Sequence, residues 1–216
     1  MSGIDGAGLY IGLTGLDGAG KSTQASYIGN YLRTRGRQCY ICEPKDDLVP
    51  QATMTIAARH RQNARGYYGT FAFELAKAFG AVRHHFSLVA PLLAAGIDVV
   101  DPRTNNCRLA LAAAHKCDSL EKLEEVYKLT RNYDVLFFVD VSPDTAFSRV
   151  NKRGTDVENL TDLINFYSAL KTTTPETACR IDGETSALAA FKEVQIILDQ
   201  LVVRTTSEQM GREQIG

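Results

Sequence analysis

Eight consecutive residues near the N-terminus have the composition of a phosphate-binding loop. Residues 15–22 read GLDGAGKS and match the pattern GxxxxGK[ST] at every defined position. Glycines let successive backbone N–H groups surround phosphate oxygens, while Lys21 neutralises the β- and γ-phosphates and the Ser22 hydroxyl reaches Mg²⁺. The pattern predicts a nucleoside triphosphate site with Mg²⁺. The predicted nucleotide contacts are Gly15, Asp17, Gly18, Ala19, Gly20, Lys21, Ser22 and Thr23.

Three further charged residues have the types that phosphoryl transfer requires. Asp101 follows an apolar run, where a carboxylate can hold Mg²⁺ through water. Arg149 and Arg153 stand four apart on a predicted helix and therefore share a face, from which they can close over ATP and the phosphoryl group in transit. The alternatives are a strand-end capping aspartate and a solvated basic helix end that the helix dipole favours.

Strands alternate with helices along the chain, and this order predicts how the charged residues are positioned. The loop at 15–22 lies between a predicted strand and a predicted helix, as its mechanism requires. Such an alternation predicts an α/β fold with a parallel sheet covered on both faces, and ligands bind beyond the carboxyl ends of its strands. Residues 45–69 are polar and poorly patterned. The predicted strands are 9–14, 38–42, 97–100, 135–141 and 177–181, and the predicted helices are 21–34, 71–93, 120–130, 143–153 and 186–203.

The overall composition is that of an ordinary soluble globular chain. Its 216 residues are 44% hydrophobic and 23% charged, with a net charge of −1, so there is no broad basic field for duplex nucleic acid. We expect one domain over residues 1–203 and a polar, flexible tail over 204–216. No stretch approaches the length of a membrane helix and no signal peptide precedes the domain, which favours a cytoplasmic location. Five cysteines suit a reducing compartment.

Several segments together resemble the thymidylate kinase family of nucleoside monophosphate kinases. The resemblance spans about residues 9–201, and the guanine-reading NKxD element of GTP-binding switch proteins is absent from the sequence. The loop and the segment 139–154 are the most specific parts. The matching segments are GLDGAGKSTQ at 15–24, Glu43-Pro44 after the second strand, the helix around Phe73 and Lys77, Asp101 after the third strand, VDVSPDTAFSRVNKRG at 139–154 and IDGETSALAAFKEV at 181–194.

The resemblance implies a fold, a reaction and a set of roles. It implies the P-loop NTPase fold with a five-stranded parallel sheet, helices on both faces, a small lid and a homodimer. It implies ATP and Mg²⁺ as cofactors, and direct transfer of the γ-phosphoryl group to a nucleoside monophosphate without a covalent intermediate. Lys21, Asp101, Arg149 and Arg153 take the catalytic roles, and Arg149 also contacts the adenine of ATP. The implied acceptor contacts are Asp17, Glu43, Pro44, Phe73, Lys77 and Arg103.

The departures from the family pattern fall mainly on the acceptor side. Asp101-Pro102-Arg103 replaces the family's DRY or DRF, so the arginine stands one position late. Lys77 and Phe79 occupy the aligned positions of a phosphate-gripping arginine and of a glutamine at the thymine pocket. Two further departures are Cys42, which replaces an arginine, and the lid motif DRxE, which reads Asp156-Val157-Glu158. The acceptor is therefore dTMP, another nucleoside monophosphate or a modified nucleotide.

Two other functions remain open at this point. A nucleoside kinase acting on a sugar hydroxyl requires a carboxylate base, which Asp17 or Glu43 supplies. The departures from the family pattern on the acceptor side are also compatible with a non-catalytic protein that binds ATP and signals by closing around it. The adjacent His84 and His85 are expected to point about 100° apart on their helix, and we interpret them as structural or surface residues.

Overall fold

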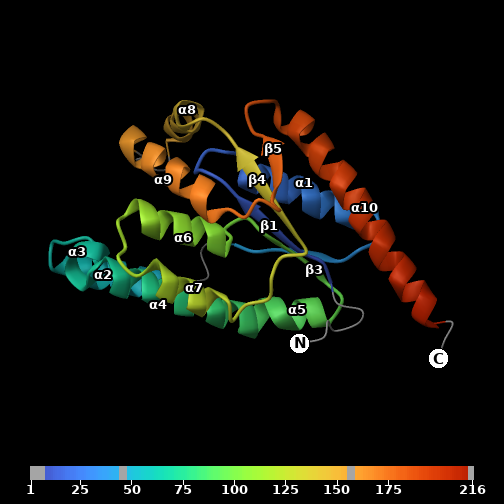
Figure 1. Ribbon diagram of the computed structural model, residues 1–216, viewed down its shortest axis with the longest axis horizontal. Helices are drawn as coiled ribbons and strands as arrows, with labels where there is room; N and C mark the ends of the chain where they lie inside the picture. Colours follow the sequence, from blue (N-terminus) through green and yellow to red (C-terminus); the bar gives the residue numbers. More distant parts are fainter. Residues whose placement is uncertain (1–7, 44–47, 155–158, 214–216) are drawn as a thin grey trace.

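A five-stranded, all-parallel sheet forms the centre of the molecule (Figure 1). The computed structural model describes residues 8–43, 48–154 and 159–213. The strand order across the sheet is β2-β3-β1-β4-β5, which confirms the predicted α/β fold. The strands are β1 (Tyr10–Thr14), β2 (Cys39–Ile41), β3 (Asp98–Asp101), β4 (Val135–Asp140) and β5 (Cys179–Asp182).

Helices cover both faces of this sheet. Figure 1 shows α1 and α10 together on one side of the strands and α6 and α9 on the other. Within the described part of the chain, none of the helices combines the length and hydrophobicity needed to span a bilayer. The helices are α1 (Lys21–Thr34), α2 (Leu48–Arg59), α3 (Ala64–Tyr68), α4 (Thr70–His84), the π-helix η1 (His85–Val89), α5 (Ala90–Ala94), α6 (Asn105–Ala114), α7 (Leu120–Tyr127), α8 (Pro143–Arg153), α9 (Leu160–Thr173) and α10 (Ala187–Glu213).

Strand β1 is the most buried element, and it leads directly into the phosphate loop. All five of its residues are buried, because β3 and β4 pair with its two edges and helices cover its faces. Gly12 pairs with Asp101 of β3 and Thr14 with Phe138 of β4, so the carboxyl ends of these three strands meet at one edge of the sheet. Loops that follow these strands therefore lie close together.

The structure agrees with the sequence for some helices and corrects it for others. Helices α1 and α8 begin and end at the predicted residues. The poorly patterned segment 45–69 contains α2 and α3, and the sequence also missed α6 and α9. The helix predicted over 71–93 is interrupted by π-helical winding at 85–89. Helix α10 continues to Glu213, beyond the predicted helix end at residue 203. The division into a kinase domain over 1–203 and a flexible tail over 204–216 stays a prediction.

A buried carboxylate ties α3 to α4. Glu74 is 1% exposed and accepts hydrogen bonds from Arg65 Nη2 at 2.7 Å and from Lys77 Nζ at 2.6 Å. Arg65 Nε donates to the same carboxylate at 3.0 Å. Two cations around one buried anion satisfy the lone pairs that burial would otherwise leave unpaired. This cluster fixes α4 relative to the short helix that precedes it.

Replacing Glu74 by alanine is expected to destabilise the fold by about 3 kcal/mol, because Arg65 and Lys77 then lie side by side without a neutralising carboxylate. Urea unfolding followed by circular dichroism measures this change. The control is Glu125→Ala, which removes an ion pair whose side chains are 66% and 71% exposed and should not change the transition. A Glu74 variant that unfolds at the wild-type urea concentration contradicts the assignment.

Candidate active site

The phosphate loop between β1 and α1 has a backbone that requires glycine. Gly15, Gly18 and Gly20 have φ angles of 145°, 86° and 100°, which other residues rarely adopt. A Cβ atom at Gly15 would lie 2.5 Å from the carbonyl oxygen of Val139, and one at Gly18 would lie 2.5 Å from that of Ala146. The loop therefore packs directly against β4 and α8.

A cavity of about 580 Å³ opens in front of this loop. Its walls come from segments far apart in the sequence: the loop and the start of α1, the turn after β3, helix α8 and the segment after β5. The structure thus gathers most of the predicted donor-site residues around one cavity. Those that line it are Asp17, Gly18, Ala19, Gly20, Lys21, Ser22, Thr23, Arg149 and Arg153, together with Arg103 from the predicted acceptor set.

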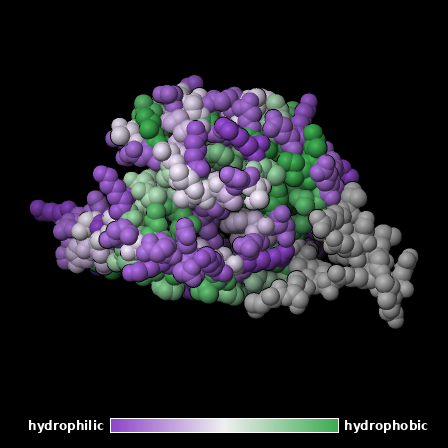
Figure 2. Space-filling view, viewed as in Figure 1, coloured by the Kyte–Doolittle hydropathy of each residue, from purple (hydrophilic) through white to green (hydrophobic). Residues whose placement is uncertain are grey.

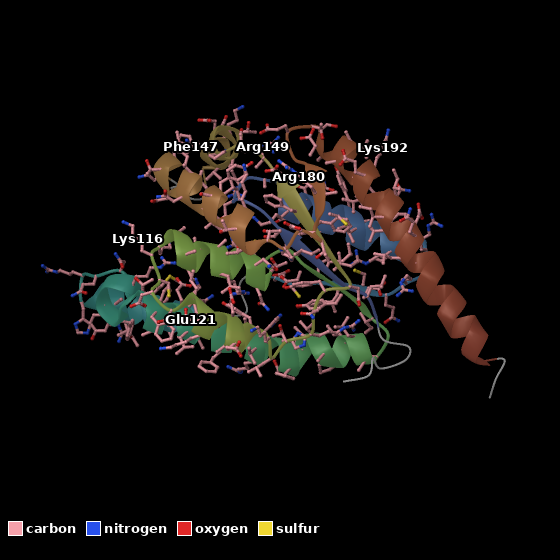
Figure 3. The ribbon with its side chains drawn as sticks, in the orientation of Figure 1. Lys116, Glu121, Phe147, Arg149, Arg180 and Lys192 are labelled. Atoms are coloured by element: carbon pink, nitrogen blue, oxygen red, sulfur yellow. The ribbon has the colours of Figure 1, made fainter. Side chains whose placement is uncertain are left out.

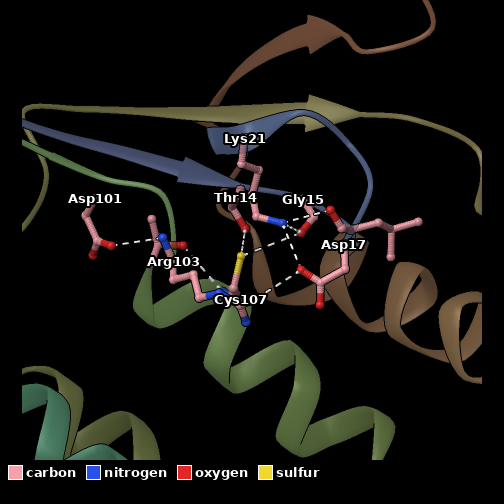
Figure 4. A network of polar contacts seen from close by, with 9 residues as sticks. Thr14, Gly15, Asp17, Lys21, Asp101, Arg103 and Cys107 are labelled. Carbon is pink, nitrogen blue, oxygen red and sulfur yellow. Dashed lines mark hydrogen bonds and ion pairs between the residues drawn. The ribbon is translucent and has the colours of Figure 1, made fainter. Parts of the chain in front are cut away.

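Lys21 is held against its own loop. Its Nζ donates to the carbonyl oxygens of Gly15 at 2.9 Å and Leu16 at 2.7 Å, and lies 3.6 Å from Asp17 Oδ1 (Figure 4). Burial alone raises the pKa of Asp17, but the charges of Lys21 and Arg103 outweigh it and leave that pKa below its usual value. The loop therefore presents an ammonium group beside an ionised carboxylate at the mouth of the cavity.

Arg103 connects β3 to the phosphate loop. Figure 4 shows it between Asp101 and Asp17: its backbone N–H donates to Asp101 Oδ1 at 2.9 Å, and its Nη2 lies 3.4 Å from Asp17 Oδ1. Arg103 lines the 580 Å³ cavity and also a second, smaller cavity next to it. The arginine that Pro102 displaces by one position thus lies at the boundary between the two spaces.

Asp101 faces the smaller cavity. Its Oδ2 accepts a hydrogen bond of 2.8 Å from the hydroxyl of Tyr133. Burial of Tyr133 and the nearby charge of Asp101 raise the pKa of this hydroxyl well above its usual value. Ser22 lines the larger cavity, so the two predicted Mg²⁺ ligands approach from adjoining spaces. A hydroxyl and a carboxylate are oxygen donors that suit Mg²⁺, which retains several waters. The described residues contain no cluster of three or more His, Cys, Asp or Glu side chains for a metal.

The two arginines of α8 form one side of the larger cavity. Ser142 caps the helix, since its hydroxyl accepts from the N–H of Thr145, and Glu184 accepts from the Ser142 N–H at 2.7 Å. In Figure 3, Arg149 extends from α8 toward the segment after β5, where its Nη1 donates to the Gly183 carbonyl at 2.9 Å. These contacts fix α8 and hold Arg149 at the cavity wall.

The predicted acceptor residues do not all meet in one place. Glu43, Asp101 and Arg103 line the smaller cavity, which measures about 40 Å³. Phe73 and Lys77 line neither cavity: Phe73 is 5% exposed in a cluster with α2 and α3, and the Lys77 ammonium lies 5.3 Å from its ring centre. Their acceptor role stays a prediction. Pro44 and the lid residues 156–158 lie outside the described residues.

The sequence did not predict two groups of residues that line the cavities. Thr185, Ser186 and Ala187 follow β5 and line the larger cavity, where Gln24 Nε2 donates to the Ala187 carbonyl at 2.8 Å. Their position after a predicted parallel strand is the signal that points to them. His84 and His85 line the smaller cavity, although the sequence indicated structural or surface roles.

Comparisons with known proteins agree with this geometry. A family model described as thymidylate kinase matches residues 13–194. A protein named thymidylate kinase from Francisella philomiragia subsp. philomiragia is 25% identical over 202 residues, covering 88% of this chain and 98% of its own. A second protein named thymidylate kinase, from Francisella tularensis subsp. novicida (strain U112), is 24% identical over 202 residues, which cover 88% of this chain and 95% of that protein. Because the family model covers most of its length, the chain belongs to the thymidylate kinase family.

Proposed function

We propose that the chain is a nucleoside monophosphate kinase that transfers the γ-phosphoryl group of ATP to dTMP and releases dTDP and ADP. Membership of the thymidylate kinase family supports this reaction. The observation that carries the proposal is the position of Arg103, which lines both cavities and lies 3.4 Å from the loop carboxylate of Asp17. A guanidinium between a donor site and an acceptor site stabilises the charge that develops as the phosphoryl group moves.

On the donor side, the loop amides and Lys21 bind the β- and γ-phosphates of ATP. Lys21 is 8% exposed, so its charge acts in a site that excludes much of the water. Arg149 and Arg153 neutralise the phosphates from the α8 wall and approach the adenine. Ser22 and Asp101 would hold Mg²⁺, partly through water, and the ion would neutralise phosphate charge.

On the acceptor side, Arg103 binds the monophosphate and Asp17 orients the acceptor next to the loop. Glu43, which follows β2 and lines the smaller cavity, contacts the acceptor. Pro44, Phe73 and Lys77 are the other proposed acceptor contacts. Arg103 supplies two or more N–H donors in a fixed geometry, which matches the oxygens of a phosphate. No residue in this set forms a covalent bond to the phosphoryl group, so the transfer is direct.

A homodimer in the cytoplasm completes the proposal. Phe79 and Phe86 are 54% and 58% exposed on α4 and η1. Figure 2 shows hydrophobic residues among hydrophilic ones along the lower edge of the molecule, where α4 and α5 run. A second copy of the chain would cover these rings. All five cysteines are free thiols, as a reducing compartment requires.

Release of ADP from ATP and Mg²⁺ in the presence of a panel of monophosphates tests the reaction. We expect dTMP to be the best acceptor, with kcat/KM at least about tenfold above that of the other natural monophosphates, because a site that fits one base leaves polar groups unpaired against another. Thymidine without a phosphate serves as the control and should not stimulate turnover. Binding of ATP without turnover on any acceptor would support the non-catalytic alternative, and turnover on thymidine would support a nucleoside kinase.

A further inference from the structure

Tyr133 contacts the candidate active site from the opposite end of the sheet. It stands two residues before β4, at the amino end of that strand, whereas Asp101 lies at the carboxyl end of β3. Ligands of a parallel sheet bind beyond the carboxyl ends of its strands. The Tyr133 hydroxyl nevertheless donates to Asp101 Oδ2 at 2.8 Å. The sequence did not predict this contact, because it depends on a side chain that crosses a neighbouring strand.

A glycine in β1 leaves room for the Tyr133 ring. A Cβ atom at Gly12 would lie 2.8 Å from Cδ1 and 2.9 Å from Cγ of Tyr133, so a larger residue would displace the ring. Tyr10 lies two residues earlier, on the same face of β1, and its ring centre is 4.4 Å from that of Tyr133. Gly12 pairs with Asp101 of β3. The ring therefore crosses β1 at the level of the Asp101 carboxylate.

Hydrogen bonds on both sides fix the backbone around Tyr133. On one side, Asp134 Oδ2 accepts from the N–H of Tyr10 at 2.7 Å, and the Asp134 N–H donates to the Tyr10 carbonyl at 2.8 Å. On the other side, the N–H of Arg131 donates to His85 Nε2 at 3.1 Å. Arg131 Nη2 also donates to Asp134 Oδ1 at 2.7 Å. The ring thus extends from an anchored segment, which holds its hydroxyl at Asp101.

Both oxygens of Asp101 are held, each by a different partner. Oδ2 accepts from Tyr133, and Oδ1 accepts from the backbone N–H of Arg103 at 2.9 Å (Figure 4). An ionised carboxylate has about four lone-pair sites, so others stay available after these two bonds. Those are the sites that a hydrated Mg²⁺ would use at Asp101. A carboxylate already fixed in one orientation needs no rearrangement when the nucleotide arrives.

We propose that Tyr133 is a positioning residue for phosphoryl transfer, whose hydroxyl holds the Asp101 carboxylate in the orientation that the reaction requires. Tyr133 lines neither of the two cavities at the site, so it acts through Asp101. Through the other oxygen of that carboxylate, the same contact supports the turn that carries Arg103. The inference rests on the proposed monophosphate kinase activity and adds to it a residue outside the matching sequence segments.

The first test compares Tyr133→Phe, which removes one oxygen and keeps the ring, with Tyr167→Phe. Tyr167 is the matched control, because its hydroxyl donates to Asp140 Oδ1 at the same distance of 2.8 Å and it lines neither cavity. Loss of one such hydrogen bond should lower the unfolding temperature by about 2–4 °C in either variant. We expect kcat/KM to fall by about tenfold or more in Tyr133→Phe, mainly in kcat, and to stay within about twofold of wild type in Tyr167→Phe.

A double-mutant cycle shows whether Tyr133 acts through Asp101. If it does, Tyr133→Phe should add less than about threefold to the loss of kcat/KM that Asp101→Ala already causes. A fall of about tenfold in both backgrounds would show a separate role for the tyrosine and overturn the proposal. Wild-type kcat/KM in Tyr133→Phe overturns it too, as does an equal loss of kcat/KM in Tyr133→Phe and Tyr167→Phe, which indicates a general structural effect.

A binding measurement decides the proposal even if wild type transfers no phosphoryl group. Calorimetry gives the affinity for a non-hydrolysable ATP analogue with Mg²⁺ and with EDTA, and the ratio of the two affinities measures the contribution of the ion. We expect Tyr133→Phe and Asp101→Ala to lower this ratio by a similar factor, and Tyr167→Phe to keep the wild-type ratio. A wild-type ratio in Tyr133→Phe would overturn the proposal. If no acceptor is phosphorylated, the proposed function fails, while a lowered ratio in Tyr133→Phe still supports the positioning of Asp101.

Discussion

Lys21→Ala is expected to lower kcat/KM for phosphoryl transfer by at least about a thousandfold, because the loop loses the cation that neutralises the β- and γ-phosphates. The Nζ of Lys21 contacts Gly15 and Leu16 oxygens at 2.9 and 2.7 Å, so its charge is already positioned before ATP arrives. The effect should appear mainly in kcat, since charge builds up on the phosphoryl oxygens as transfer proceeds.

The fold should survive this substitution. Asp17 loses one cation but keeps Arg103 at 3.4 Å, and its side chain is 32% exposed, so solvent compensates for the lost partner. Circular dichroism and thermal unfolding measure the fold, while ADP release measures turnover. Lys192→Ala removes an exposed lysine from α10, outside both cavities, and should match wild type in both assays. Wild-type turnover in Lys21→Ala would show that the loop is not the catalytic phosphate site.

The donor side could be predicted from the sequence because its determinants are local. Gly15, Gly18 and Gly20 occupy positive φ angles within one short loop, and Lys21 and Ser22 follow them at the start of α1. Such a loop specifies its own conformation through neighbouring residues, so its spacing alone identifies it. Arg149 and Arg153 were predicted for a similar reason, since a four-residue spacing on a short helix places them on one face.

The acceptor side could not be predicted in the same way, because its walls depend on contacts between distant segments. Helical spacing indicates which face of residues 70–84 is apolar, but not which turn lies opposite the ends of β2 and β3. The structure places the end of α4 and the start of η1 opposite these strand ends, with His84 and His85, whereas Phe73 lies about three turns earlier against α2 and α3. A change from α to π winding has no reliable sequence signal and depends on packing.

Arg103→Ala is expected to lower kcat/KM by about a hundredfold to a thousandfold, since it removes the guanidinium that lies between the two cavities. The Arg103 side chain is 50% exposed and its ion pair with Asp17 spans 3.4 Å, so the loss should change stability little. Arg103→Lys keeps a charge but not the two parallel donors, and should recover only part of the activity.

Separate measurement of kcat and of the KM for each substrate distinguishes the roles of Arg103. If it binds the monophosphate, the KM for dTMP rises while the KM for ATP changes little, and if it stabilises the transferring group, kcat falls. Arg83→Ala provides the matched control, because Arg83 is exposed on α4 and lines neither cavity. Activity within threefold of wild type in Arg103→Ala, about 0.7 kcal/mol of transition-state free energy, would contradict a role in the transfer. The phosphate would then have to be held from α4, where Lys77 is already paired with Glu74 at 2.6 Å and would have to leave that carboxylate to bind it.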